Sequence, residues 1–387
     1  MTSPAVPFAA AAPWLAVPLI TLVRLRDSPS LEDVPATPSL DAPLISVVIP
    51  ARNEARNIAR CVESILRSRY PALEVIVVND RSEDETGIIA HAFAERDPRV
   101  KVVDAPPLPA GWFGKQWACT QGALVARGAL LCFTDADTTH APDLLARAEH
   151  AMRAQSLDFL SVAGHQEMGT FWERVVQPQV FTMLAMRYGG AHHVNRSTRA
   201  SDKIANGQFM LFTRAAYDDV GGHGAVRTKA AEDLALAQLL FARGKRTALV
   251  SGITLLSTRM YASLGEIVRG WMKNIYAGAL DAVPFGALGR MLLPLALLLA
   301  PLATLAPVVL LLLGLAGVVS GAVTTWALLC TVILLIWWAS VYGIAIRMTP
   351  AYAFTFPLGA VVVAYIIVRA LARGRRVEWK GRVYRAG

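Results

Sequence analysis

The chain has 387 residues, of which 54% are hydrophobic and 17% are charged, and its formal net charge is +9 at pH 7. Soluble domains carry about 25% charged residues, so this composition excludes an ordinary soluble protein and favours a globular domain joined to membrane segments. Many basic residues flank apolar runs and no nucleic-acid-binding motif is present, so we expect an anionic membrane surface as partner and no nucleic acid. The four cysteines form no Cys-x-x-Cys pair, which argues against structural zinc and a disulfide framework.

An apolar run without charged residues covers residues 6–23 and is followed by Arg24 and Arg26. Its length is close to the ~20 residues that cross a bilayer as a helix. A cleaved signal peptide is the alternative, but its basic end would come first, and here it comes last. We therefore expect an N-terminal transmembrane anchor over residues 1–26, with its arginines in the cytosol, and a linker over residues 27–43.

Short apolar strands alternate with helical patterns over residues 44–262. Ile45–Ile49 and Glu74–Val78 are rich in β-branched residues, as is typical of strands buried in a parallel sheet. Further strands are expected at residues 100–103, 129–133 and 159–162. This progression predicts an α/β domain with a mostly parallel, Rossmann-like sheet and helices on both faces.

Polar clusters follow three of the expected strands, at residues 50–54, 79–82 and 134–137. Ligands of parallel α/β sheets bind at the carboxyl ends of the strands, so these clusters are expected to converge. In the last cluster Asp135 and Asp137 flank one residue, which lets both carboxylates reach the same Mg²⁺ or Mn²⁺ ion. Asp-x-Asp alone is more often a solvated turn, but its place after a buried strand favours the metal site.

Three further positions carry candidate chemistry, each with a structural alternative. Asp80 can accept hydrogen bonds from a nucleobase or ribose, or cap the next helix with Ser82. Lys115 lies in a glycine-containing loop before a helix, which suits a diphosphate although the Walker spacing is missing. Glu232 and Asp233 precede an apolar helix, where acidic residues are usually caps. A sugar-inverting transfer needs a carboxylate as general base, and Asp233 is the candidate.

Several motifs occur in a fixed order between about Ile45 and Leu280. They are Val-Val-Ile-Pro-Ala-Arg-Asn-Glu, Val-Val-Asn-Asp-Arg-Ser, Gly-Lys-Gln-Trp-Ala, Thr-Asp-Ala-Asp, Gly-Gln-Phe-Met-Leu-Phe, Gly-Gly-His-x-Ala-Val-Arg and Ala-Glu-Asp-Leu-Ala-Leu-Ala. In this order and spacing they resemble the family 2 glycosyltransferases, whose fold is the nucleotide-sugar-binding GT-A type.

The resemblance implies a nucleotide-sugar donor, expected to be a UDP-sugar, held through Mg²⁺ or Mn²⁺. It implies a donor pocket that contains Pro50, Ala51, Glu54, Asp80, Lys115 and Asp135. It further implies metal ligands at Asp135 and Asp137, a general base at Asp233, and acceptor or diphosphate contacts at Gln208, Glu232, Arg269 and Trp271.

Processive members of the family carry a Gln-x-x-Arg-Trp motif. Here Gly270 separates Arg269 from Trp271, which argues against a polymerising synthase and favours transfer of a single sugar. Three motifs in combination, Gly-Trp-Phe-Gly-Lys, Gly-Trp-Met-Lys-Asn and the terminal Val377-Glu-Trp-Lys-Gly-Arg-Val-Tyr384, are similar to bacterial lipid-directed members of the family. Among these the resemblance is to the carotenoid (diaponeurosporenoate) glycosyltransferases, with hopanoid-associated and ceramide-glucosyltransferase-like groups nearby. A lipid acceptor is therefore expected. The alternatives are a processive synthase that exports a polysaccharide and a non-catalytic membrane protein with a glycosyltransferase-like domain.

The remaining segments are apolar or amphipathic. Residues 169–190 are either core or a surface helix, and residues 263–290 are expected to lie at the membrane interface, where Trp271 and Tyr276 fit. Residues 291–372 are expected to hold two spans and a third span or a re-entrant segment at Pro357, before a basic tail at 373–387. Three full spans would place that tail outside, whereas its charge favours the cytosol, so we prefer the re-entrant segment. The expected location is a bacterial inner membrane, multi-pass, with a cytoplasmic catalytic domain; no pattern predicts the oligomeric state.

Overall fold

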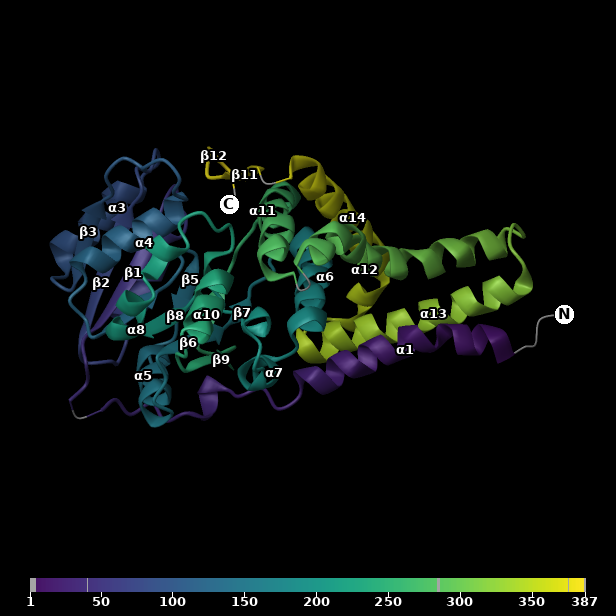
Figure 1. The fold of residues 1–387 in the computed structure, drawn as a ribbon, viewed down its shortest axis with the longest axis horizontal. Coiled ribbons are helices and arrows are strands. Elements are labelled where there is room, and N and C mark those ends of the chain that lie inside the picture. The colour runs from purple at the N-terminus through teal and green to yellow at the C-terminus, as the bar shows by residue number, and fades with distance from the viewer. Residues whose placement is uncertain (1–4, 40, 284–285, 375, 386–387) are drawn as a thin grey trace. The chain divides into compact units, whose positions relative to one another are not determined.

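The computed structural model describes residues 5–39, 41–283, 286–374 and 376–385. These residues form two compact units, each assembled from separate parts of the chain. The sheet unit contains residues 27–167, 191–260 and the final described residues 376–385. The helical unit contains residues up to Arg26, residues 168–190 and residues 261–374. Both are drawn in Figure 1, coloured along the chain.

The sheet unit is built around a seven-stranded sheet with the strand order β3-β2-β1-β4-β8-β6-β9. Its strands are β1 (Ile45–Ala51), β2 (Leu73–Asn79), β3 (Val100–Asp104), β4 (Leu130–Phe133), β6 (Phe159–Ala163), β8 (Met210–Thr213) and β9 (Thr247–Ser251). Strand β8 runs antiparallel to both of its neighbours, and the other pairs are parallel. The predicted mostly parallel α/β sheet is confirmed.

Alternating residues of the central strands fill two separate cores. Val47 and Ile49 pack on one face against α2 (Ile58–Leu66), α3 (Thr86–Arg96) and α5 (Leu144–Ala154). Val48 and Ile76 pack on the other face against α4 (Gly114–Val125), α8 (Arg214–Asp219) and α10 (Glu232–Ala242). Successive side chains of a strand point to opposite faces, so both faces of the sheet are apolar and are covered by helices. Helices on both faces were predicted.

Smaller elements complete the sheet unit. A second sheet has the order β5-β10-β7, formed by β5 (Thr138–His140), β10 (Leu256–Thr258) and β7 (His165–Gln166). The short helices are α7 (Ala191–Arg196) and α9 (Gly222–Ala225), with 3-10 turns at Leu31–Asp33 and Ala200–Asp202. Strands β11 (Arg376–Trp379) and β12 (Arg382–Arg385) form an antiparallel hairpin.

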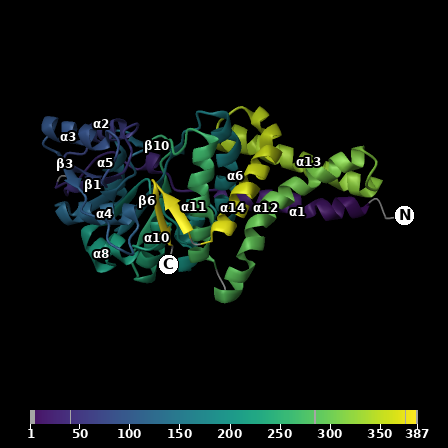
Figure 2. The same cartoon turned by 90° about the horizontal axis from the view of Figure 1, so that it is seen from above.

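The helical unit contains α1 (Ala5–Leu25), α6 (Phe171–Tyr188), α11 (Leu264–Ala282), α12 (Gly286–Leu315), α13 (Gly321–Ser340) and α14 (Phe356–Arg373). Figure 2 shows the same helices from above. A π-helical turn at Val341–Ala345 and a 3-10 segment at Pro350–Thr355 connect α13 to α14. Four helical stretches are long and apolar enough to cross a membrane: Val6–Leu25, Gly286–Leu315, Gly321–Ala345 and Pro350–Arg373.

Helices α6 and α11 share a core with α14, formed by residues such as Val175, Ile267 and Ile366. Trp271, for which an interface position was expected, is only 5% exposed and contacts the edges of the Phe181 and Tyr261 rings. The tryptophan turns inward because α11 packs on other helices rather than lying alone on a surface.

Helix α14 contains Pro357, at which a re-entrant segment was expected. Residues 356–373 form one unbroken helix. Pro357 lies in its first turn, where the missing N–H breaks no hydrogen bond. At Gly359 the helix lies against α6 so closely that a Cβ would be 2.6 Å from the carbonyl oxygen of Val175.

Candidate functional site

The carboxyl ends of β1, β2 and β4 lie side by side at one edge of the large sheet. Ala51, at the end of β1, pairs with Asn79 at the end of β2, and Val48 pairs with Phe133 at the end of β4. The polar residues that follow these strands therefore meet at this edge, as predicted from the strand order of a parallel sheet. Pro50 and Ala51 are the last residues of β1, and Ala51 is buried.

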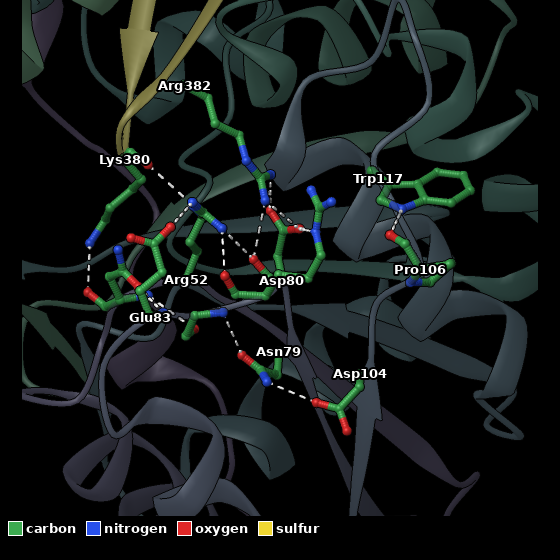
Figure 3. A network of polar contacts seen from close by, with 12 residues as sticks. Arg52, Asn79, Asp80, Glu83, Asp104, Pro106, Trp117, Lys380 and Arg382 are labelled. Atoms are coloured by element: carbon green, nitrogen blue, oxygen red, sulfur yellow. Dashed lines mark hydrogen bonds and ion pairs between the residues drawn. The ribbon is translucent and has the colours of Figure 1, made fainter.

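Arg52 ties the loops after β1 and β2 together (Figure 3). Its guanidinium donates hydrogen bonds to the carbonyl oxygens of Asp80 at 2.9 Å and Arg81 at 2.6 Å, and it forms an ion pair with Glu83 at 2.9 Å. The side chain is almost fully buried. No sequence pattern singled out Arg52, since its backbone partners become visible only once the two loops are adjacent.

Asp80 is 1% exposed, and its carboxylate is bound by Arg382 of the hairpin at 2.6 and 3.2 Å. It does not cap the following helix, because α3 begins six residues later, at Thr86. The sequence placed Asp80 directly after a buried strand, as the structure shows, but did not reveal Arg382, which is 302 residues away along the chain.

Lys115 lies between two carboxylates from other elements. Its Nζ is 2.6 Å from Asp135 Oδ1, after β4, and 2.6 Å from Glu232 Oε1, at the start of α10. Burial alone would lower the pKa of Lys115, but the charges of Asp135 and Glu232 outweigh burial and raise it well above the usual value. Lys115 is therefore a cation at neutral pH, and it compensates the two carboxylates.

Asp137 is the more enclosed carboxylate of the Asp-x-Asp pair. Its Oδ1 is buried and has no hydrogen-bond partner among the described residues. Burial and the charges of Asp135 and Glu54 raise its pKa to about 7. This environment contradicts the alternative of a solvated turn.

The Asp-x-Asp pair supplies two carboxylates to a candidate cation site. No group of three or more His, Cys, Asp or Glu side chains that could hold a metal was found within the described parts of the chain. Two carboxylates with an unsatisfied buried oxygen nevertheless suit a hard divalent ion that takes its other ligands from phosphate and water. In this structure the ammonium of Lys115 supplies the positive charge beside Asp135.

Asp233 lies in the first turn of α10 and accepts hydrogen bonds from the backbone N–H of Gly207 at 3.0 Å and of Leu234 at 2.8 Å. Burial and the neighbouring charge of Glu232 raise its pKa to about 6, against the opposing effects of Lys115 and the two N–H groups. A carboxylate in this state is ionised at neutral pH and basic enough to accept a proton.

The other predicted contacts have different surroundings. Gln208 is 6% exposed, and its Oε1 accepts hydrogen bonds from Gln166 Nε2 at 2.9 Å and Asn206 Nδ2 at 3.1 Å. Arg269 and Trp271 belong to α11 of the helical unit, where the arginine is exposed and the tryptophan is buried. The cluster described above contains Glu54, Asp80, Lys115, Asp135, Asp137, Glu232 and Asp233. Gln208 directly follows Gly207, whose N–H binds Asp233.

The sequence model of glycosyl transferase family 2 matches residues 46–221. Residues 46–221 are a family 2 glycosyltransferase domain. This range contains β1, β2 and β4 and both carboxylates of the Asp-x-Asp pair. Glu232 and Asp233 follow it.

Curated relatives include the 4,4'-diaponeurosporenoate glycosyltransferases of Staphylococcus aureus strains MRSA252 and USA300, each 27% identical over 241 residues. The alignment spans 61% of this chain and 61% of each relative's length. Among solved structures, a mannosyltransferase from Pyrobaculum calidifontis in complex with GDP-Man and Mn²⁺ superimposes with a TM-score of 0.61. It is 20% identical, and the match covers 95% of this chain and 98% of that one. The GT-A fold expected from the sequence is confirmed.

Proposed function

We propose that this protein transfers a single sugar from a nucleoside-diphosphate sugar to a lipid acceptor at a membrane, with inversion at the anomeric carbon. The observation that carries the proposal is the meeting of Lys115, Asp135 and Glu232 beside Asp233 in a family 2 domain. These residues come from the ends of three separate elements, and together they offer a diphosphate-binding cation and a base.

The donor is proposed to bind along the edge formed by β1, β2 and β4. Pro50, Ala51, Glu54 and Asp80 would line the nucleoside end, where Asp80 can accept hydrogen bonds from base or ribose. Lys115 would meet the diphosphate, because its raised pKa keeps it charged. Asp135 and Asp137 would hold Mg²⁺ or Mn²⁺, which when bound neutralises charge on the departing nucleoside diphosphate. A UDP-sugar is the proposed donor.

Asp233 is proposed to take the proton from an acceptor hydroxyl as that oxygen attacks the anomeric carbon; a carboxyl acceptor is already ionised at neutral pH and would attack as the carboxylate. Its two backbone N–H bonds fix the carboxylate, and its raised pKa makes it a stronger base than an exposed aspartate. A single displacement with one base inverts the configuration. Gln208, Glu232, Arg269 and Trp271 remain predicted contacts of the acceptor or diphosphate.

The lipid acceptor is supported by two observations. Four helices are long and apolar enough to cross a bilayer, which brings a membrane-dissolved acceptor within reach of the protein. The curated relatives act, by their names, on diaponeurosporenoate. We therefore propose a long apolar acceptor with a terminal carboxyl or hydroxyl group, and a multi-pass protein of the inner membrane with a cytoplasmic sheet unit.

The polymerising alternative is less well supported. In α11, Gly270 packs directly against the ring of Tyr261, where a Cβ would collide. Glycine at position 270 therefore fits the packing of α11 against Tyr261, and the Arg-Gly-Trp sequence differs from the processive motif.

Release of nucleoside diphosphate by the purified full chain tests the proposal. We expect release from UDP-sugar that depends on extracted bacterial lipid, stops with a chelator and returns with added Mn²⁺. Mass spectrometry of the lipids should show one added hexose. A ladder of added sugars would instead favour the synthase, and no release from UDP- or GDP-sugars would favour a non-catalytic protein.

A further inference from the structure

The β11–β12 hairpin is bound to the strand ends at which the donor is proposed to lie. Its two central residues, Lys380 and Gly381, have positive φ angles of 46° and 77°. Two left-handed residues form the tight turn that matches the twist of a β-hairpin, and the second is the glycine that such a turn prefers. The turn thus presents the side chains of Lys380 and Arg382 at a defined position.

The turn binds the loop that follows β1. Lys380 Nζ is 2.8 Å from the Glu54 carboxylate and donates a hydrogen bond to the carbonyl oxygen of Asn53 at 3.1 Å. In the other direction, Arg52 Nε donates to the carbonyl oxygen of Lys380 at 3.2 Å. Figure 3 shows Lys380 and Arg382 approaching Arg52 and Asp80 from the hairpin.

Arg382 forms the shortest of these contacts. Its Nη1 and Nη2 donate to the two oxygens of Asp80 at 2.6 and 3.2 Å, in the two-pronged geometry that suits a carboxylate. Gly114, at the start of α4, makes room for this pair: a Cβ there would lie 2.8 Å from Asp80 Oδ2 and 2.9 Å from Arg382 Nη1. The absence of a side chain at position 114 thus leaves room for the ion pair between Asp80 and Arg382.

Tyr384 extends the contact to the loop before α4. Its ring stacks on that of Phe113, with centroids 4.5 Å apart and an angle of 16° between the planes. Phe113 is the residue immediately before α4, two positions from Lys115. The hairpin therefore contacts the proposed nucleoside end at Glu54 and Asp80, and also the loop that carries the proposed diphosphate-binding lysine.

We propose that the hairpin completes the nucleoside end of the donor site and that Arg382 is a positioning residue, which orients Asp80 for the nucleobase or ribose. This inference rests on the proposed function. A carboxylate has about four lone-pair positions and Arg382 uses two of them, so a nucleoside would take the others at the buried Asp80. Lys380 and Arg382 also offset the charges of Glu54 and Asp80, which would otherwise repel an anionic donor.

In the opposite arrangement the hairpin would block the site until nucleotide displaces it. Every hairpin variant would then change nucleotide affinity in the opposite direction. Removing a blocking residue tightens nucleotide binding, whereas removing a positioning residue weakens it. The measurement of affinity therefore separates the two.

The test uses the full chain in detergent, with UDP and GDP as probes in the presence of Mn²⁺. We expect Arg382→Gln to raise the dissociation constant for the nucleotide by about tenfold or more, the effect of losing a charged hydrogen-bond pair. Arg382→Lys should recover part of the loss. Val383→Ala is the matched control, because Val383 lies on the same strand and is 71% exposed, and it should bind like the unaltered protein.

Kinetics with the donor sugar distinguish positioning from a general loss of structure. Arg382→Gln should raise KM for the donor and leave kcat within about twofold. If Arg382→Gln does not fold, Tyr384→Ala replaces it as the test variant, because the loss of Tyr384 leaves no buried charge without a partner. Tyr384→Ala should also weaken nucleotide binding. Unchanged or tighter binding by these variants would overturn the inference while the proposed function stands. If the unaltered protein binds neither nucleotide, the proposed function itself fails.

Discussion

Lys115 and Asp233 show how neighbouring charges set the chemistry of single residues in this domain. Lys115 stays cationic because Asp135 and Glu232 outweigh its burial. Asp233 becomes a stronger base because burial and Glu232 outweigh its two backbone hydrogen bonds. Glu232 therefore acts on both residues, and changes at these positions should have separable effects.

Replacing Asp233 by Asn removes the proposed base but keeps the size of the side chain. We expect kcat to fall by about 10²- to 10⁴-fold, the usual contribution of a positioned base, with donor affinity unchanged. Single-turnover transfer and nucleotide titration on the same preparation measure the two quantities. Normal turnover would contradict the role of Asp233.

The raised pKa of Asp233 also predicts a pH profile. A base must be ionised to accept a proton, so the transfer rate should fall as the pH drops through about 6. In Glu232→Gln the neighbouring negative charge is lost, the pKa of Asp233 falls, and the acidic limb of kcat should move to lower pH. A limb that stays in place or moves to higher pH would show that another group controls it.

At the scale of elements, Glu74 joins the amino ends of several strands of the sheet. Its buried carboxylate accepts hydrogen bonds from Ser46 Oγ at 2.7 Å and Arg127 N at 2.7 Å, and it pairs with Lys101 at 3.1 Å. Burial would raise its pKa, but these bonds outweigh burial and lower it to about 2. Glu74 lies at the edge opposite the donor site, so its effects should be structural.

Glu74→Gln should lower the free energy of unfolding by about 1–3 kcal/mol, the usual cost of leaving buried groups without their partner. Because the folded pKa is depressed, the contribution of the carboxylate is complete above its ordinary pKa of 4.5 and is lost as the pH falls through about 2. The difference in unfolding midpoint between the variant and the unaltered chain should therefore shrink below pH 4.5. A constant difference would contradict this account.

At the scale of the whole molecule, the sequence predicted those features of the fold that depend on local residue patterns and on the order of the strands. The runs Ile45–Ile49 and Glu74–Val78 identify buried parallel strands, and a parallel sheet then brings Asp80 and Asp135 to one edge. Arg382 was not predictable, since no local pattern links a short strand to an aspartate 302 positions earlier. The burial of Trp271 was missed for a similar reason, because it depends on which helices pack against α11.

The docked hairpin constrains the path of the chain through a membrane. The chain leaves the sheet unit for residues 168–190 and again for residues 261–374, and both times it returns, the second time as the hairpin bound to Asp80. If the sheet unit lies on one side, each excursion crosses the bilayer an even number of times. On that condition the 18-residue helix α6 would not cross, and α12, α13 and α14 would not all cross. We expect α14 to be the exception, since it packs against α6 and is the most buried of the three.

Labelling with a membrane-impermeant maleimide checks this arrangement, with little background because the four native cysteines are buried. Cysteine at Val318, between α12 and α13, should react from the side opposite the sheet unit. Cysteine at Thr349, before α14, and at Val383 in the hairpin should react from the same side as one at Glu95 in the sheet unit. Any other pattern would contradict a non-crossing α14. For residues 261–374 the even count follows from the contacts of the hairpin with Asp80 and Glu54: a hairpin held there would keep both ends of this apolar segment on the same side of the bilayer.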